Sequence, residues 1–312
     1  MLFFKPVLMK IIFFLTIVSS QILFPNKIQS ATIQSVNNYF NGSHLRYMSQ
    51  AENTAKFYFD RGKSKYESAD SKGAVTDLNQ AIKINPKYVD AFNGRGIVKI
   101  DLGDIQGAII DFNQAIKINP EFAKAYNNRG SAKILLEDGQ GAIIDFNQAI
   151  KFDSRYAEAF NGRGSAKILL GDGRGAIIDF NQAIEIEPRA AKAYSNRGIL
   201  KSKLGDKAGA IMDLNKAIEI NPGYAVAYSN RGLFKADSKD RVGAIVDYNQ
   251  AIKVDPKYAT AYSNRGLAKS FLGDKSGAID DMTKAANLFR QQRRTKEYQQ
   301  TIQQLKRIKE KK

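Results

Sequence analysis

A 34-residue repeat dominates this sequence. An Arg-Gly pair recurs at that interval seven times, from Arg61-Gly62 to Arg265-Gly266, and a Gly-Ala pair begins eleven residues after each first glycine. An aromatic residue stands four positions before that glycine, and proline ends five of the seven repeats. Self-similarity at this period is typical of stacked supersecondary units. The 312 residues therefore need not form two ordinary domains, because a solenoid grows along one axis and has no central core.

Each repeat is expected to contain two helices. In the second repeat, apolar or small residues follow helical spacing in a first helix and again in a second. Between them, Gly103 suits a left-handed C-cap and Asp104 an N-cap worth about 1 kcal/mol. Asn119-Pro120 then ends the second helix. The residues of the two stripes are Ala91, Phe92, Gly96, Val98, Ile100 and Leu102, then Ala108, Ile109, Phe112, Ala115 and Ile116.

The order aromatic, Gly, Ala, aromatic, Ala, Pro resembles the tetratricopeptide-repeat family from Ala55 to about Phe289, and its Arg-Gly and Gly-Asp steps resemble bacterial, including cyanobacterial, members. The resemblance implies an all-α, right-handed superhelical solenoid of seven helix-turn-helix repeats. Three features depart from the pattern: Ser154 replaces a proline, Met282 and Thr283 weaken the last repeat, and a lysine stands where the family more often has an aromatic residue. These lysines are Lys65, Lys99, Lys133, Lys167, Lys201, Lys235 and Lys269.

The segments outside the repeats have distinct compositions. Thr295 to Lys312 is expected to form a helix whose apolar stripe covers the end of the stack, as a terminal cap must. The stripe is Tyr298, Ile302, Leu305 and Ile308. The resulting plan is a signal peptide or anchor at 1–30, a polar linker at 31–54, repeats at 55–88, 89–122, 123–156, 157–190, 191–224, 225–258 and 259–289, and a basic capping helix at 290–312.

The N-terminus has the pattern of a secretory signal. Lys5 and Lys10 precede an apolar run from Ile11 to Phe24, which is short for a membrane-spanning helix. Export to a periplasmic, lumenal or extracellular space is therefore expected, and the alternative is an uncleaved anchor formed by residues 11–24. The chain has no cysteine, so it forms no disulfide, thiolate metal site or lipidated cysteine.

Charged residues recur in register with the repeat. Seven arginines and seven aspartates keep the same spacing, as in Arg129 and Asp145. A catalytic pair occurs once in a chain, whereas a scaffold pair occurs in every repeat, so an ion pair between the two helices of each repeat is expected. The segment Gly171–Gly175 looks like a phosphate loop but has no preceding strand. No catalytic residue, metal site or cofactor site is predicted, and an enzyme is not expected.

The resemblance implies a concave groove lined by the first helices, which holds a peptide. An asparagine amide both donates and accepts, so it can bind a peptide backbone of any sequence. The alternative is local, because asparagine near a helix start can bond to its own backbone. The asparagines carried to groove positions are Asn93, Asn127, Asn128, Asn161, Asn196, Asn230 and Asn264.

Apolar residues occur on the same helices, and any that remain exposed would mark a partner site. They are Ile97, Ile100, Ile134, Leu135, Ile168, Leu169, Ile199, Leu233, Leu267 and Phe271. The Lys–Asn pair of the family's carboxylate-clamp subclass is absent, because Phe59 and Lys63 stand at its positions. Binding to chaperone C-termini is therefore not predicted.

The charge is basic, with a net value of +17, and residues 290–312 carry nine Lys or Arg against two Glu. The predicted function is a non-enzymatic scaffold that binds a protein or peptide segment. The alternative is a membrane-surface tether whose basic C-terminal helix contacts anionic lipid. A third possibility, a module of a transferase or secretion machine, requires a catalytic partner. Nucleic acid is not an expected partner, because export is expected and the sequence contains no nucleic-acid fold motif.

Overall fold

The computed structural model describes residues 50–310, which form fifteen helices in sequential pairs and contain no strand. The predicted signal segment and most of the predicted linker lie outside the described residues, and residues 50–54 of that linker are already helical. The helices are a segment at 50–67, α3 (Ser71–Ile84), α4 (Val89–Asp101), α5 (Ile105–Ile118), α6 (Ala123–Leu135), α7 (Gly139–Phe152), α8 (Ala157–Leu169), α9 (Gly173–Ile186), α10 (Ala191–Lys203), α11 (Lys207–Ile220), α12 (Ala225–Asp237), α13 (Arg241–Val254), α14 (Ala259–Phe271), α15 (Lys275–Gln291) and α16 (Thr295–Glu310).

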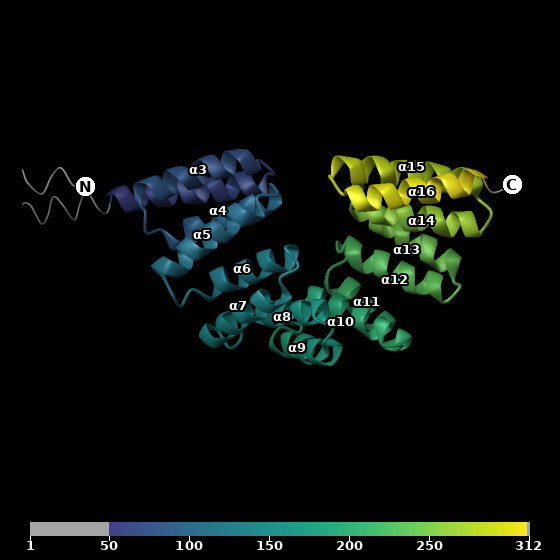
Figure 1. Ribbon diagram of the computed structural model, residues 1–312, viewed down its shortest axis with the longest axis horizontal. Helices are drawn as coiled ribbons and strands as arrows, with labels where there is room; N and C mark the ends of the chain where they lie inside the picture. Colours follow the sequence, from purple (N-terminus) through teal and green to yellow (C-terminus); the bar gives the residue numbers. More distant parts are fainter. Residues whose placement is uncertain (1–49, 311–312) are drawn as a thin grey trace, which may run out of the picture. The chain divides into compact units, whose positions relative to one another are not determined.

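The chain divides into two compact units between Val98 and Lys99, within α4. In the first unit, Tyr58, Leu78 and Ala91 belong to one apolar cluster that joins the helix at 50–67, α3 and the start of α4. The second unit extends to the C-terminus and contains α5 to α16, stacked in chain order (Figure 1). The first helix of a repeat is its N-terminal helix (for example α8), and the second helix is its partner (α9).

Aspartate caps begin all seven second helices, as the sequence predicts. In each case the carboxylate accepts a hydrogen bond from the amide of the glycine three residues later, at 2.8–2.9 Å. Such a bond satisfies one of the amides that a helix start leaves without an intrahelical partner. Gly103 adopts a φ of 83° at the end of the preceding first helix, which confirms the predicted left-handed turn. These caps fix each turn between paired helices.

Small residues allow the paired helices to approach closely. A Cβ atom added to Gly164 on α8 would lie 2.7 Å from Cε1 of Phe180 on α9, so only glycine fits under that ring. Ala176, Phe180 and Ala183 of α9 are fully buried. Each repeat thus has a small core of alanines around one large side chain.

The first helices of the second unit form a continuous layer. Consecutive members contact each other, α6 with α8, α8 with α10, α10 with α12 and α12 with α14, whereas no pair of second helices in this unit makes comparable contact. Second helices instead bridge to the next first helix, as α7 does to α8. A partner that follows the first helices therefore meets neighbouring repeats side by side.

The last helix packs on α15, but one predicted contact is wrong. Ile308 is buried and Tyr298 and Leu305 are half-buried, as predicted, whereas Ile302 is 41% exposed and Thr301 is buried in its place. At 3.6 residues per turn, positions 298, 301, 305 and 308 share one face, and position 302 falls at its flank.

Candidate functional site

Six of the seven recurring aspartates are each the centre of a three-residue charge cluster. In the third repeat, Arg129 donates from Nε to Asp145 Oδ2 at 2.9 Å and from Nη2 to Oδ1 at 2.5 Å. Lys133, one turn further along α6, lies with Nζ 2.8 Å from the same Oδ2. The Asp145 side chain is buried, so it needs these partners. The predicted Arg–Asp ion pair is confirmed here and in five further repeats, at Arg61, Arg163, Arg197, Arg231 and Arg265.

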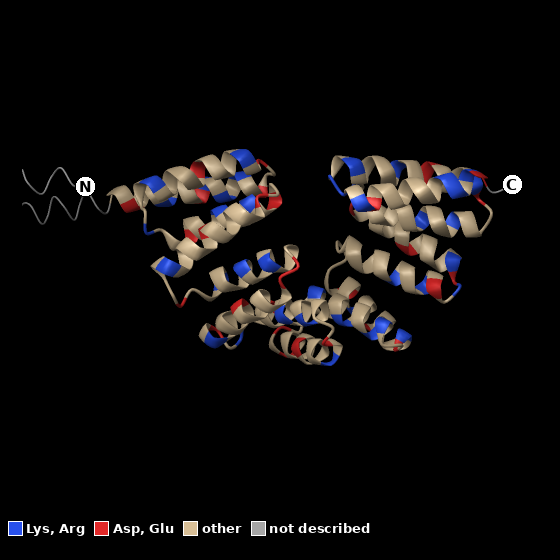
Figure 2. Cartoon of the chain, viewed as in Figure 1, with Lys and Arg blue, Asp and Glu red and all other residues tan. Residues whose placement is uncertain are grey.

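The same arginines connect adjacent repeats. Arg129 Nη1 donates to Asn113 Oδ1 of the preceding second helix at 2.6 Å, and Arg163 does the same to Asn147 at 2.7 Å. The guanidinium of Arg129 also lies over the Tyr126 ring, 5.4 Å from its centroid. These contacts recur along the chain and engage all three guanidinium nitrogens of the arginine. The charge clusters are therefore scaffold, and Figure 2 shows both signs of charge distributed along the helices.

The role of the recurring lysines could not be seen from the family pattern, which places an aromatic residue there. The signal was present in the spacing, because each lysine follows its arginine by four residues and so shares its helix face. In the first repeat, hydrogen bonding from Arg61 lowers the pKa of Asp77 to about 2; burial opposes the shift, and Lys65 supports it. The lysine thus stabilises a carboxylate that the arginine alone was expected to hold.

The predicted asparagines fall in two neighbouring registers rather than one row. Asn93, Asn127 and Asn161 are the fifth residues of their first helices, where later repeats have Ser195, Ser229 and Ser263. The remaining asparagines are sixth residues: Asn128, Asn196, Asn230 and Asn264. Asn93 and Asn127 are buried, whereas the other five are half-buried. The amides that a partner could reach are therefore mainly those of the sixth register, together with Asn161.

Two of these amides join across a repeat boundary. Asn196 Nδ2 on α10 donates to Asn161 Oδ1 on α8 at 3.0 Å. This bond leaves the Asn161 amide nitrogen as a donor and the Asn196 oxygen as an acceptor. By contrast, Asn127 donates to its neighbour Asn128 at 3.3 Å, and its own buried oxygen has no hydrogen-bond partner. The pair between α8 and α10 thus presents both halves of a peptide-group contact.

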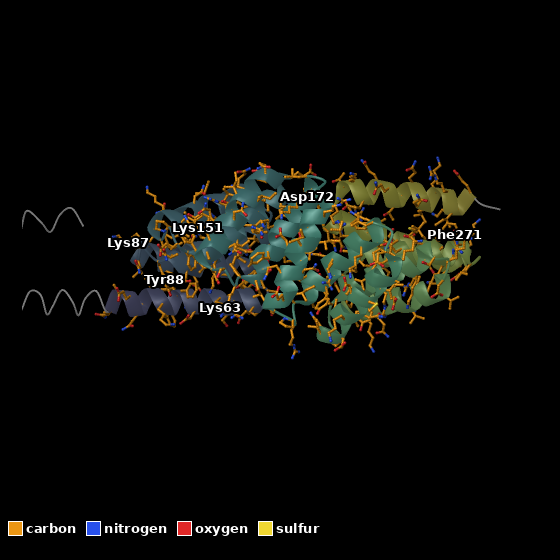
Figure 3. All side chains as sticks on the ribbon, turned by 90° about the horizontal axis from the view of Figure 1, so that it is seen from below. Lys63, Lys87, Tyr88, Lys151, Asp172 and Phe271 are labelled. Carbon is orange, nitrogen blue, oxygen red and sulfur yellow. The ribbon has the colours of Figure 1, made fainter. Side chains whose placement is uncertain are left out.

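Several apolar residues of the first helices remain exposed. Leu135, Leu169, Leu233 and Phe271 are exposed, while the other six residues of the predicted apolar set are half-buried. Phe271 lies at the C-terminal end of α14 (Figure 3), and the Arg241 guanidinium sits 4.8 Å from its ring centroid. Exposed apolar residues beside amide groups make this layer suitable for a protein partner.

The described residues show no obvious site for other chemistry. Within residues 50–310, no three His, Asp or Glu side chains are grouped so that they could hold a metal ion. Over the same range, every helix is too short or too polar to cross a membrane. Gly171 adopts a φ of 81° in the turn before α9, as an inter-helix turn requires, and no strand leads into it.

The fold and its charge clusters define an all-α repeat solenoid. Four segments match models of the tetratricopeptide repeat: residues 98–135 and 243–273 (TPR repeat), and residues 123–156 and 191–224 (tetratricopeptide repeat). No curated protein matches the sequence. These matched segments, which together make up less than half of the chain, are similar to tetratricopeptide repeats, a family whose members are typically non-enzymatic and bind protein or peptide partners.

Solved structures with the same fold are distant in sequence. A tetratricopeptide repeat protein from Parabacteroides merdae ATCC 43184 is 20% identical, with a TM-score of 0.61 over 80% of this chain and 99% of that one. The APC/C hetero-tetramer Cut9–Hcn1 is 16% identical, with a TM-score of 0.63 over 73% and 45%. The thermophilic repeat protein TTC0263 from Thermus thermophilus is 19% identical, with a TM-score of 0.54 over 58% and 98%. At these identities the similarity concerns the fold alone.

Proposed function

We propose that this chain is a non-enzymatic scaffold that binds a peptide segment of another protein along its layer of first helices. The observation that carries the proposal is the Asn161–Asn196 bond, which leaves one donor and one acceptor at the boundary of two repeats. A peptide group offers the matching acceptor and donor whatever its side chain. Asn230 and Asn264 are half-buried and their side chains make no hydrogen bond in the described chain, so they extend the same contact to later repeats.

The apolar residues of the layer supply the rest of the binding energy. Leu233 lies three residues after Asn230 on the same helix and remains exposed. Residues three apart are neighbours on a helix surface, so an amide and an apolar contact occur side by side. An extended segment with alternating backbone and side-chain contacts fits such a surface.

A binding experiment with random peptides tests the proposal. The full chain would be immobilised and used to select peptides from a random library. The affinity of the selected peptides would then be compared between the wild type and a variant in which Asn128, Asn196 and Asn230 are changed to alanine. Each lost hydrogen bond is worth about 0.5–1.5 kcal/mol, so affinity should fall by about tenfold or more in total. The matched control changes Gln106, Gln140 and Gln250 to alanine, because these exposed amides lie on second helices. Equal loss in both variants, or none in the first, would refute the assignment.

A second candidate function is attachment to an anionic membrane surface through α16. Lys296, Arg307 and Lys309 are exposed and form no ion pair in the described chain. Each basic residue near such a surface is worth about 1 kcal/mol at low ionic strength. Vesicles containing phosphatidylserine should then bind the full chain, and Arg307→Gln with Lys309→Gln should weaken binding. Binding that survives high salt would count against this function.

The location of the protein is also a proposal. The basic and apolar pattern of residues 1–24 supports export, with the repeats acting outside the cytoplasm. Fractionation of cells that express the full chain, with a mass measurement of the mature N-terminus, would test this. A cytoplasmic product that retains Met1 would contradict it.

A further inference from the structure

The residue that caps each first helix of the second unit is aromatic except in one case. The N-cap residues of α6, α8, α10, α12 and α14 are Phe122, Tyr156, Ala190, Tyr224 and Tyr258. None makes a side-chain capping bond, so the ring is not there to cap the helix. Its role must lie in what it packs against.

The ring covers the start of the preceding first helix. Tyr224 packs in the apolar cluster that contains Ala191 and Tyr194 of α10, and Tyr258 packs with Ala225 and Tyr228 of α12. Burial raises the pKa of Tyr224, and the neighbouring Ser195 hydroxyl partly opposes that rise. Tyr258 has the same relation to Ser229. Tyr224 and Tyr258 therefore lie over the preceding first helix near its fifth residue, although the buried Ser195 hydroxyl has no hydrogen-bond partner in the described chain.

Exposure of the fifth residue follows the presence of the ring. Asn127 is followed in the next repeat by the N-cap ring of Tyr156, and it is 9% exposed. Ser195 and Ser229, which are followed by the rings of Tyr224 and Tyr258, are 0% and 1% exposed. Asn161 is followed in the next repeat by the N-cap residue Ala190, which has no ring, and it is half-buried. The apolar cluster around Ala176 and Phe180 does not include Ala190, the N-cap residue of α10.

The position where Ala190 has no ring lies beside the polar side-chain atoms of Asn161 and Asn196 that make no hydrogen bond within residues 50–310. Asn161 occupies the same helix position as Ser195 and Ser229, and its side-chain amide nitrogen makes no hydrogen bond in the described chain. We propose that Asn161, Ala190 and Asn196 bound an open site that takes a tyrosine side chain from the bound peptide. The inference rests on the proposed function and adds the side chain that this boundary selects. The incoming ring occupies the place that Tyr224 and Tyr258 fill elsewhere, and Asn161 donates to its hydroxyl.

Stability provides the first test, because it requires no ligand. The variant Ala190→Tyr, made in the full chain, places a ring where the other repeats have one. Its midpoint of thermal unfolding should rise above that of the wild type, and the small side chain of the control Ala190→Ser should not produce a rise. A lower midpoint for Ala190→Tyr would overturn the proposal, since the site would then have no room for a ring.

Binding provides the second test. The probes are acetyl-Ala-Ala-Tyr-Ala-Ala-amide and the same peptide with Phe or Ala at its centre. They would be titrated into the full chain while the side-chain amide NMR signals of Asn161 and Asn196 are followed. Assignment comes from Asn161→Ser and Asn196→Ser. Burial of the ring predicts that the Tyr peptide binds about tenfold or more tighter than the Ala peptide. The Phe peptide should fall between them, and Ala190→Tyr should abolish the preference.

The outcomes separate this inference from the proposed function. Equal affinity of the Tyr and Ala peptides, or a preference that persists in Ala190→Tyr, would overturn the tyrosine site. If the Ala peptide still binds and loses affinity in the three-asparagine variant, the first-helix layer remains the binding surface. A preference for tyrosine that only Ala190→Tyr removes supports both.

Discussion

Arg163 on α8 holds both carboxylate oxygens of Asp179 on α9, from Nε at 3.0 Å and from Nη2 at 2.6 Å. Lys167 reaches the same carboxylate at 2.8 Å, and Arg163 Nη1 donates to Asn147 in the preceding repeat at 2.7 Å. One arginine thus joins two helices of its own repeat and the repeat before it. Packing within a repeat and stacking between repeats are coupled through the same side chain.

Asp179→Asn should therefore be strongly destabilising. Removing one partner of a buried ion pair leaves the others without compensation, and such changes cost about 3–5 kcal/mol. Here Arg163 and Lys167 would both lose their carboxylate. Urea unfolding followed by far-ultraviolet circular dichroism would measure the loss.

The matched control removes a carboxylate of the same kind from the surface. Asp60 pairs with Lys56 at 2.7 Å on one exposed helix face. Asp60→Asn should change the free energy of unfolding by only about 0.5 kcal/mol. If both variants cost the same, the buried cluster contributes no more than a surface pair.

Acid should weaken the first repeat in a defined range of pH. Arg61 lowers the pKa of Asp77 from an ordinary value of 3.8 to about 2. A carboxyl group whose pKa is lower in the folded state stabilises the fold above its unfolded pKa. That stabilisation is lost as the pH falls from about 4 towards 2.

Hydrogen exchange of the α3 amides, measured across this range, would follow the loss. Asp77→Asn should remove the pH dependence of this region between pH 4 and pH 2, because no proton then binds at position 77. An unchanged acid profile in Asp77→Asn would assign the effect to other carboxylates.

The periodicity of the sequence determines much of this structure in advance. Capping by Asp104 and its equivalents, the left-handed turn at Gly103 and the pairing of Arg129 with Asp145 were all predictable, because each depends on local spacing or recurs in every repeat. Repetition was informative here, because a charged pair that recurs in every repeat is expected to belong to the scaffold.

Differences between repeats were harder to predict. The burial of Asn127 and the partial exposure of Asn161 depend on the next repeat, where Tyr156 and Ala190 stand 29 residues later at equivalent positions. Helical periodicity describes one helix at a time and does not show what a neighbouring helix covers. Likewise, a stripe predicted to include Ile302 missed Thr301, which is the buried residue of that turn.

Gly164→Ala should destabilise its repeat despite the higher helix propensity of alanine. The added Cβ would lie 2.7 Å from Phe180 Cε1, so the ring or the helix must move, at a cost of about 1–3 kcal/mol. Gly94→Ala is the control, because the nearest atoms to its Cβ, on Leu78 and Phe59, lie at 3.6 Å. That change should stabilise by up to about 1 kcal/mol. Chemical unfolding of both variants would show opposite signs, and equal signs would reject close helix approach as the reason for Gly164.

Three of the seven turns within repeats contain a residue that their left-handed conformation disfavours, namely Ala69, Glu137 and Lys239. Glu137 has a φ of 60° and Lys239 a φ of 69°, at a position where Gly103, Gly171, Gly205 and Gly273 have values of 81–92°. A side chain with a Cβ is strained in this left-handed region, whereas glycine is not. Glu137→Gly and Lys239→Gly should therefore each stabilise the protein, by about 0.5–1 kcal/mol.

The reverse substitution, Gly171→Glu, serves as the control for these two variants. A Cβ added at Gly171 meets no atom within 4 Å. The substitution therefore changes the free energy of unfolding only through the strain of a left-handed backbone conformation. The control should lose about 1 kcal/mol, and the double variant Glu137→Gly with Lys239→Gly should combine the two gains, because the sites lie in different repeats. Differential scanning calorimetry would measure all four proteins. A neutral Gly171→Glu would mean that these turns relax out of the left-handed region when glycine is replaced, and the gains at positions 137 and 239 should then disappear as well.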